Sequence, residues 1–189
     1  LRANLTDPDS RMLKTRNGYL QGYNCQTAVS EDHFILHAQA TQDANDSRQF
    51  EPTVTALNST ITELAGHTGR DDLSIGVLLG DAGYDSDHNL TLPGPDRLIA
   101  ANRTNPHPDA TARRLMDQRL TTDEGRDLYK HRSGIVEPAN AWLKDRRGLR
   151  HFLRRGLTAA TSELRLAAAV TNLLRLHQLG VTTTRLATG

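Results

Sequence analysis

The chain has 189 residues, with 23 Lys and Arg against 22 Asp and Glu, and a mean hydropathy of −0.57. This length suits one domain with a full core, or one domain with a small appendage. No run approaches the roughly 20 apolar residues of a membrane span, and residues 1–7 lack a signal peptide's apolar core, so we expect a cytoplasmic protein. The single cysteine, Cys25, excludes an internal disulfide and a multi-cysteine zinc site.

The charges are distributed unevenly along the chain. Residues 1–96 hold 6 Lys and Arg against 14 Asp and Glu, whereas residues 97–155 hold 14 against 7. An acidic half followed by a basic half is typical of a metal site beside a surface that binds a polyanion. Two ordinary surface faces with segregated charges would give the same pattern, and composition leaves both interpretations open.

The first predicted elements are a β-hairpin and a helix. Residues 18–30 alternate as a strand does, and residues 33–41 form a second predicted strand after a turn. Asp46 followed by Gln49 is typical of a capping box, and Gly66 is the expected end of the helix. The apolar positions at helical spacing between them are Phe50, Val54, Leu57, Ile61 and Leu64.

Two short apolar runs then predict strands. Residues 75–79 lack alternation, which favours a buried central strand, and the run ends in Gly80-Asp81. Residues 98–101 form the next strand, between loops that contain several prolines.

The C-terminal half is predicted to be helical. A helix covers about 110–120, and Thr121 with Glu124 opens a helical region to Arg147 that we expect to be broken or kinked near Ser133-Gly134 and Pro138. A last helix spans about 158–179, and its apolar positions are Leu164, Ala168, Leu173, Leu176 and Leu179. The order of strands and helices indicates an α/β or α+β domain with a mixed sheet.

The first candidate site is the turn after the strand at 75–79. Asp81 lies just past the carboxyl end of that strand, where open α/β sheets place their ligands. The competing interpretation is that Asp81 caps the following turn and that Gly83 allows it. For this motif alone, capping is the favoured interpretation.

The second candidate site is the helical segment that contains Tyr129, Arg132, Glu137 and Lys144. Glu137 and Lys144 are seven residues apart and face the same way on a helix, while Ile135, Ala139 and Trp142 project from the opposite side. The segment therefore offers an apolar back and a front with a carboxylate and a cation. An ordinary solvated face remains the alternative.

The third candidate is the basic segment 144–155. It holds six Lys and Arg and one Asp in twelve residues, including Lys144, Arg146, Arg147 and Arg150. Arginine is favoured where phosphates are held in a planar, bidentate way. Because the segment continues directly from Glu137, phosphate contact is favoured over a merely solvated basic face.

Four longer motifs follow one another along the chain: LTDPDSRMLKTRNGYLQGYNCQTAVS at 5–30, TQDANDSRQFEP at 41–52, GDAGYDS at 80–86 and YKHRSGIVEPANAWLKDRRGLRHFLRRGL at 129–157. Together they resemble the C-terminal part of DDE transposases encoded by bacterial insertion sequences. The last motif is similar to that family's Tyr–Arg–Glu–Lys signature. Two residues separate Tyr129 from Arg132, four separate Arg132 from Glu137, and six separate Glu137 from Lys144.

The resemblance implies an RNase H-like fold and DNA cleavage and strand transfer at transposon ends. It implies that Asp81 and Glu137 are catalytic metal ligands, and that Tyr129, Arg132 and Lys144 contact DNA. Two Mg²⁺ or Mn²⁺ ions would serve this chemistry, and hard cations prefer carboxylate oxygens. The implied partners are double-stranded DNA and a second copy of the chain in a homodimer, at the bacterial nucleoid.

The family's first catalytic Asp, in a short Asp-Gly/Ala-Thr motif, has no counterpart in this sequence. We therefore expect an RNase H-like core over 1–157 that lacks its first strand, in a truncated or partial transposase, with a C-terminal helix and tail over 158–189 packed on it. The alternatives are a non-catalytic protein for DNA binding or oligomerisation, and another RNase H-like nuclease. The DNA upstream of the first codon would discriminate between an enzyme fragment and a remnant.

Overall fold

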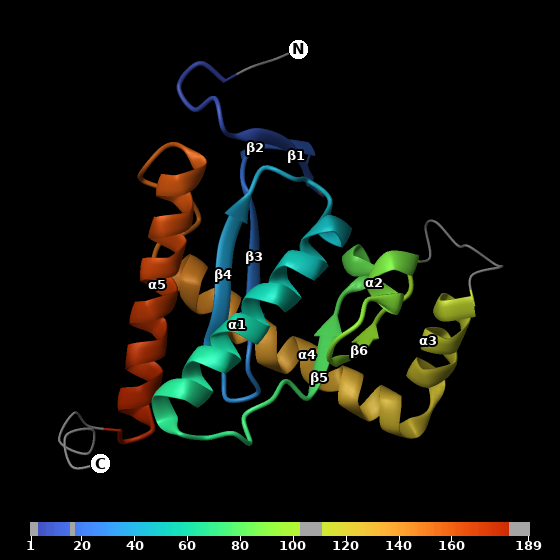
Figure 1. Cartoon of the computed structure of the whole chain (residues 1–189). Coiled ribbons are helices and arrows are strands. Elements are labelled where there is room, and N and C mark those ends of the chain that lie inside the picture. Colours follow the sequence, from blue (N-terminus) through green and yellow to red (C-terminus); the bar gives the residue numbers. More distant parts are fainter. Residues whose placement is uncertain (1–3, 16–17, 103–110, 182–189) are drawn as a thin grey trace. The chain divides into compact units, whose positions relative to one another are not determined.

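A computed structural model describes residues 4–15, 18–102 and 111–181, and the chain divides into two compact units. Unit 1 comprises Leu1–Ala44 and Ile135–Gly189, and unit 2 comprises Asn45–Gly134. Figure 1 shows the elements of both units, coloured along the sequence. Each unit is described by itself.

Unit 1 contains two antiparallel hairpins. Strand β1 (Arg11–Thr15) pairs with β2 (Gly18–Gly22), and β3 (Asn24–Val29) pairs with β4 (Ile35–Thr41). The second hairpin confirms the predicted one, but the single strand predicted over 18–30 is interrupted. The interruption falls at Tyr23, a buried residue whose hydroxyl donates a hydrogen bond to Asp7 (2.6 Å), and the chain changes its pairing partner there.

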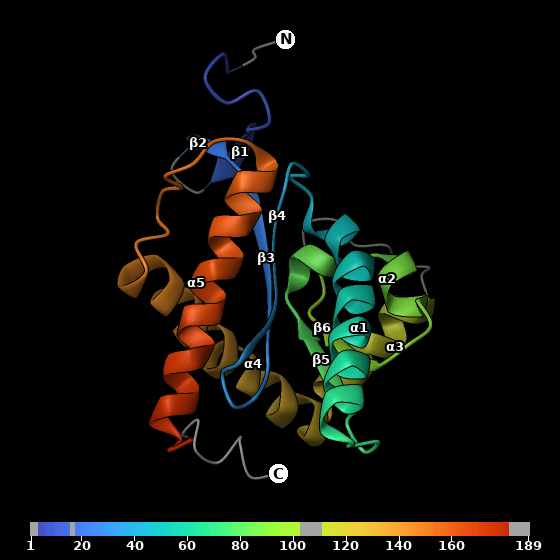
Figure 2. The same ribbon diagram turned by 60° about the vertical axis from the view of Figure 1, so that its left-hand side comes forward.

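Helix α5 (Leu157–Gln178) lies along β4 and closes the core of unit 1 (Figure 2). Asn172 fixes the register, because its amide both accepts from the Ile35 N–H (2.8 Å) and donates to the Ile35 carbonyl (2.9 Å). The predicted apolar face of α5 is correct at Leu164 and Ala168 but wrong at its C-terminal end, where Leu173, Leu176 and Leu179 are exposed. One cluster of the core consists of Ile35, Ala38, Ala139, Leu143, Leu164, Ala167 and Ala168, and a second consists of Tyr23, Ala40 and Ala160.

The N-terminal segment caps helix α5. Its N-cap residue is Gly156, which has no side chain to accept the free N–H groups of the first turn. The Asp7 carboxylate accepts from the Gly156 N–H (3.2 Å), and the Asp9 carboxylate accepts from the Leu157 N–H (2.9 Å). Two acidic side chains at a helix N-terminus also complement the helix dipole.

Unit 2 is organised around helix α1 (Phe50–Thr68) and a parallel pair of strands, β5 (Val77–Gly80) and β6 (Asp96–Ile99). The predicted helix is confirmed, but its ends are not. Asn45, not Asp46, caps the preceding 3₁₀ turn η1 (Asp46–Gln49), and Gly69 in the left-handed conformation (φ 66°) ends the helix instead of Gly66. The core of unit 2 consists of Phe50, Val54 and Ile99, with Leu78, Tyr84, Leu90 and Leu92 packed against it.

The remaining elements of unit 2 are short. They are the 3₁₀ turn η2 (Ala82–Tyr84), helix α2 (Asp87–Thr91) and helix α3 (Thr111–Thr121). The strand predicted at 75–79 begins two residues later, and its first residue, Val77, is exposed, so it is not the buried central strand that we expected.

Helix α4 (Asp123–Ala141) runs without a break through Ser133-Gly134 and contains Pro138, so of the predicted break or kink the break is wrong. Thr122, not Thr121, caps its start, because the Thr122 hydroxyl accepts from the Gly125 N–H (3.0 Å). After Ala141 the chain continues into a π-helical turn, η3 (Trp142–Arg146).

The mixed α and β composition is as predicted. The described strands form three two-stranded sheets, two antiparallel and one parallel, rather than the single mixed sheet that we expected. Among the described helices, none has the length and apolar character needed to cross a membrane.

Candidate active site and nucleic-acid interface

Asp81 directly follows strand β5 and caps the turn after it. Its side chain accepts a hydrogen bond from the Gly83 N–H (2.9 Å), and it remains exposed to solvent. The capping interpretation of this motif is therefore correct. Capping occupies Oδ1 only, so the carboxylate keeps lone pairs that can take a cation.

A second carboxylate, Asp46, lies beside the Asp81 turn. A Cβ placed on Gly83 would be 2.9 Å from Asp46 Oδ2 and 3.0 Å from Asp81 Oδ1. Burial, followed by the negative charges of Asp46 and Asp81, raises the pKa of the neighbouring Tyr84 hydroxyl. The sequence pattern favoured Asp46, three residues before Gln49, as a helix cap, and left it only as a fallback candidate for the missing first ligand.

Tyr129 and Arg132 of helix α4 belong to the same neighbourhood. The Tyr129 hydroxyl donates to the carbonyl of Gly80 (2.9 Å), the residue before Asp81. The Arg132 guanidinium lies 5.7 Å from the centre of the Tyr129 ring, within the range of a cation–π interaction. Unit 2 therefore brings together three of the predicted site residues, and burial raises the pKa of the Tyr129 hydroxyl.

Glu137 and Lys144 are exposed, as the helical spacing predicted. On the other side of the same segment Ala139 and Leu143 are buried, and Trp142 packs edge-on against His33 with 5.9 Å between ring centres. Glu137 lies in unit 1 and Asp81 in unit 2. That the Asp81 and Glu137 carboxylates lie close enough together to share a metal ion remains a prediction.

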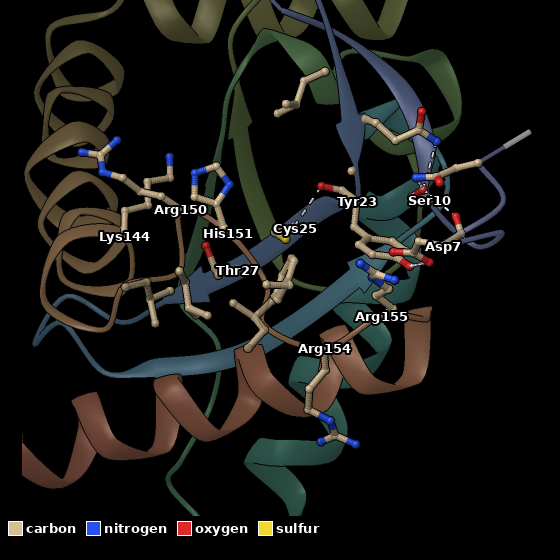
Figure 3. Close-up of a pocket in the computed structure, with 18 of the residues that line it drawn as sticks. Asp7, Ser10, Tyr23, Cys25, Thr27, Lys144, Arg150, His151, Arg154 and Arg155 are labelled. Carbon is tan, nitrogen blue, oxygen red and sulfur yellow. Dashed lines mark hydrogen bonds between the residues drawn. The ribbon is translucent and has the colours of Figure 1, made fainter. Parts of the chain in front are cut away.

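A pocket of about 690 Å³ opens in unit 1 beside the basic segment (Figure 3). Its walls come from residues 4–10, strands β2 and β3, the end of α4, η3, the loop 149–155 and helix α5. Lys144 and Arg150 are part of these walls. Arg146 and Arg147 are not part of the lining; the Arg147 Nε is instead 3.4 Å from the Thr171 hydroxyl of α5. Arg150 forms an ion pair with Asp145.

Cys25 is also part of the pocket wall. Its side chain reaches solvent, yet the surrounding protein atoms partly desolvate the thiol and raise its pKa to about 11. The Lys144 ammonium has a smaller effect in the opposite direction. The thiol is therefore neutral at physiological pH and is a poor nucleophile or metal ligand.

No group of three or more His, Cys, Asp or Glu that could hold a metal ion occurs among the described residues. Asp46 and Asp81 are hard oxygen donors of the kind that Mg²⁺ and Mn²⁺ prefer, and so is the exposed Glu137. The carboxylate oxygens of the predicted ligands are therefore chemically suited to bind a divalent cation.

Residues 100–177 match the family model of the transposase DDE domain, and this segment contains Tyr129, Arg132, Glu137, Lys144 and the basic residues that follow. The match confirms the resemblance to DDE transposases, whose partner is DNA and which in general use divalent metal ions. No significant match was found among curated proteins or among solved structures.

Proposed function

We propose that this chain carries two metal ligands and the DNA-binding face of a transposase that cleaves and joins DNA at transposon ends. The observation that carries the proposal is the position of helix α4. Its Tyr129 hydroxyl is bonded to Gly80, next to Asp81, and Glu137 belongs to the same helix and to the same Tyr–Arg–Glu–Lys signature. All signature residues of α4 and η3 lie within the matched segment 100–177.

In this proposal Asp81 and Glu137 hold Mg²⁺ or Mn²⁺, as part of an RNase H-like arrangement. Such ions, when bound, supply the Lewis acidity that activates an attacking hydroxyl and stabilises a leaving oxygen in phosphodiester transfer. Arg132, positioned over the Tyr129 ring, would hold a phosphate near the ions, and the Tyr129 hydroxyl would fix the turn that presents Asp81.

The other DNA contacts in the proposal are the cations of η3 and the loop after it: Lys144, Arg146, Arg147 and Arg150. They contact phosphates, so binding to duplex DNA is expected to be weakly sequence-selective and strongly salt-dependent. Replacing Arg146, Arg147 and Arg150 by Ala should lower the affinity and reduce the slope of log K against log salt by about 2.7. Unchanged binding and slope would remove this segment from the interface.

Titration with Mn²⁺ tests the metal ligands, with the free ion followed by electron paramagnetic resonance. We expect Asp81→Asn and Glu137→Gln each to abolish the same Mn²⁺ site. The double variant should therefore bind Mn²⁺ no more weakly than either single variant. The amide of Asp81→Asn still accepts from the Gly83 N–H, so folding is preserved, and Asp32→Asn is the charge-matched control. Two separate sites lost independently would show that the carboxylates do not share an ion.

A non-catalytic DNA-binding protein is the second candidate, since the exposed cations Lys144, Arg146 and Arg150 can contact phosphates without a bound metal. The two candidates differ in one assay, which uses duplex DNA from the flanks of the reading frame with Mg²⁺ or Mn²⁺. Cleavage that disappears in the Asp81→Asn, Glu137→Gln double variant supports the transposase. A partial transposase that lacks the family's first catalytic Asp would also bind without cleaving, so the second candidate is supported by binding without cleavage only when no Mn²⁺ site depends on Asp81 and Glu137. The transposase proposal also includes assembly as a homodimer at the nucleoid. Light scattering over a range of protein concentrations measures the molar mass and therefore the dimer.

A further inference from the structure

The pocket of unit 1 has an unusual concentration of basic side chains. Lys144 and Arg150 were expected at a DNA interface, but His151, Arg154 and Arg155 line the same cavity and have no role in the function proposed above. In Figure 3, Lys144, Arg150 and His151 are grouped at one end, and Arg155 lies at the other end beside Asp7 and Tyr23. The guanidinium of Arg154 points away from the centre of the pocket.

Most of this positive charge has no partner within the described structure. Arg150 is paired with Asp145, whereas Lys144 and Arg155 form no ion pair with any described residue. The carboxylate within the lining, Asp7, is already engaged by the Tyr23 hydroxyl (2.6 Å) and the Gly156 N–H (3.2 Å). The pocket therefore presents an excess of positive charge, which suits an anionic ligand.

The shape of the pocket restricts which anion fits. A cavity of about 690 Å³ has the size of a site for a small molecule or a few nucleotides, and its concave wall cannot follow the convex surface of a duplex. Two aromatic rings, Tyr23 and Phe152, form part of the wall and meet edge to face at 6.0 Å. Basic walls combined with aromatic rings are the usual composition of grooves that hold single-stranded nucleic acid.

We propose that this pocket binds an unpaired DNA strand, whose phosphates contact Lys144 and Arg150 at one end and Arg155 at the other. This inference rests on the proposed DNA-binding function. It adds that the bound strand is unpaired, that the strand lies in the concave pocket, and that His151 and Arg155 belong to the binding site. Duplex DNA would use Arg146 and Arg147, outside the pocket, and the exposed Lys144 and Arg150, which the pocket shares, and a strand freed from the duplex would enter beside them.

Removal of one pocket cation tests the phosphate contact. We expect Arg155→Ala to weaken binding of an oligothymidylate of about 12 nucleotides, a length within the site sizes of single-strand binders, and to reduce the salt slope by about 0.7. Arg155→Lys should restore the slope because it keeps the charge. The control is Arg114→Ala, which removes an exposed cation of unit 2. Equal effects of Arg155→Ala and Arg114→Ala would overturn the assignment.

The single cysteine of the chain provides an independent probe, because Cys25 lies in the pocket wall. We expect saturating oligothymidylate to slow alkylation of Cys25 at least about tenfold, and a duplex of the same length to slow it much less. Alkylation that is unaffected by the oligothymidylate would overturn the pocket proposal while leaving duplex binding intact. Failure of duplex binding with continued protection by the single strand would instead contradict the proposed function.

Discussion

Gly83 is the position where the acidic turn tolerates least change. A methyl group there would come within 3.0 Å of the Asp81 and Asp46 carboxylates, so one of them must move. We expect Gly83→Ala to break the Asp81 cap and to lower the free energy of unfolding by about 1 kcal/mol. Gly76→Ala is the control, since a Cβ there meets nothing within 4 Å. Urea denaturation measures both, and equal stabilities would mean that the turn accommodates the methyl group.

The thiol of Cys25 gives a prediction about pH. Its pKa is about 11 in the folded chain against an ordinary value of about 9, so the folded state favours the protonated thiol. The associated stability is complete below pH 9 and is lost as the pH rises towards 11, because the unfolded thiol ionises first. At pH 8 iodoacetamide should alkylate the folded chain roughly 100-fold more slowly than the urea-unfolded chain. Similar rates would contradict the raised pKa.

For some helices and strands, sequence patterns were sufficient to predict the secondary structure. Helices α1 and α5 and the hairpin β3–β4 follow from periodicity, which depends only on neighbours along the chain. Their ends and faces were harder to predict. Asp46 and Thr121 were the expected caps, and Asn45 and Thr122 are the actual ones, because a cap depends on local backbone geometry. Helix α5 is capped from residues 7–9, which no pattern within the helix can reveal.

The cap of α5 can be tested by removing either acidic side chain. Asp9→Ala should lower the stability of unit 1 by about 1 kcal/mol through loss of the bond to Leu157. Asp7→Ala should lower it by about 1–3 kcal/mol, because the buried Tyr23 hydroxyl also loses its partner. Asp32→Ala serves as the control, since only its backbone carbonyl is bonded, to Arg175. If the three variants had equal urea midpoints, the cap would contribute nothing.

Two glycines of helix α4 should respond to alanine in opposite directions. A Cβ at Gly134 meets nothing within 4 Å, so Gly134→Ala should stabilise the chain by about 1 kcal/mol through helix propensity. A Cβ at Gly125 would overlap the Arg119 carbonyl oxygen, so Gly125→Ala should destabilise it. Thermal unfolding followed by circular dichroism measures both changes. A loss of stability in Gly134→Ala would indicate that the helix needs a glycine there.

At the scale of the whole molecule, the two units have separate cores, and the single tryptophan, Trp142, lies in unit 1. We expect Asp9→Ala to shift the unfolding transition seen by Trp142 fluorescence. Gly83→Ala should shift the far-ultraviolet circular dichroism transition while leaving the fluorescence transition in place. If either variant moved both transitions together, the chain would unfold as one cooperative body.

The sequence predicted the exposure and position of the candidate residues better than it predicted their contacts. The exposure of Glu137 and Lys144 follows from helical spacing, and the position of Asp81 follows from the end of a strand. The proximity of Asp46, the bond from Tyr129 to Gly80 and the pocket around Cys25 depend on contacts between distant segments. Such contacts leave no periodic trace in a single sequence.

The core of unit 1 joins residues from opposite ends of the chain, and this has a consequence for biosynthesis. Ile35 and Ala38 leave the ribosome long before Leu164 and Ala168, their partners in the core. The β3–β4 hairpin must therefore wait, with its apolar face exposed, while all of unit 2 is translated and can fold. Nascent chains arrested after residue 134 should be cleaved by protease within residues 18–41, and chains extended so that α5 has left the exit tunnel should resist. A chaperone that covers the hairpin during this interval would raise the yield of folded protein.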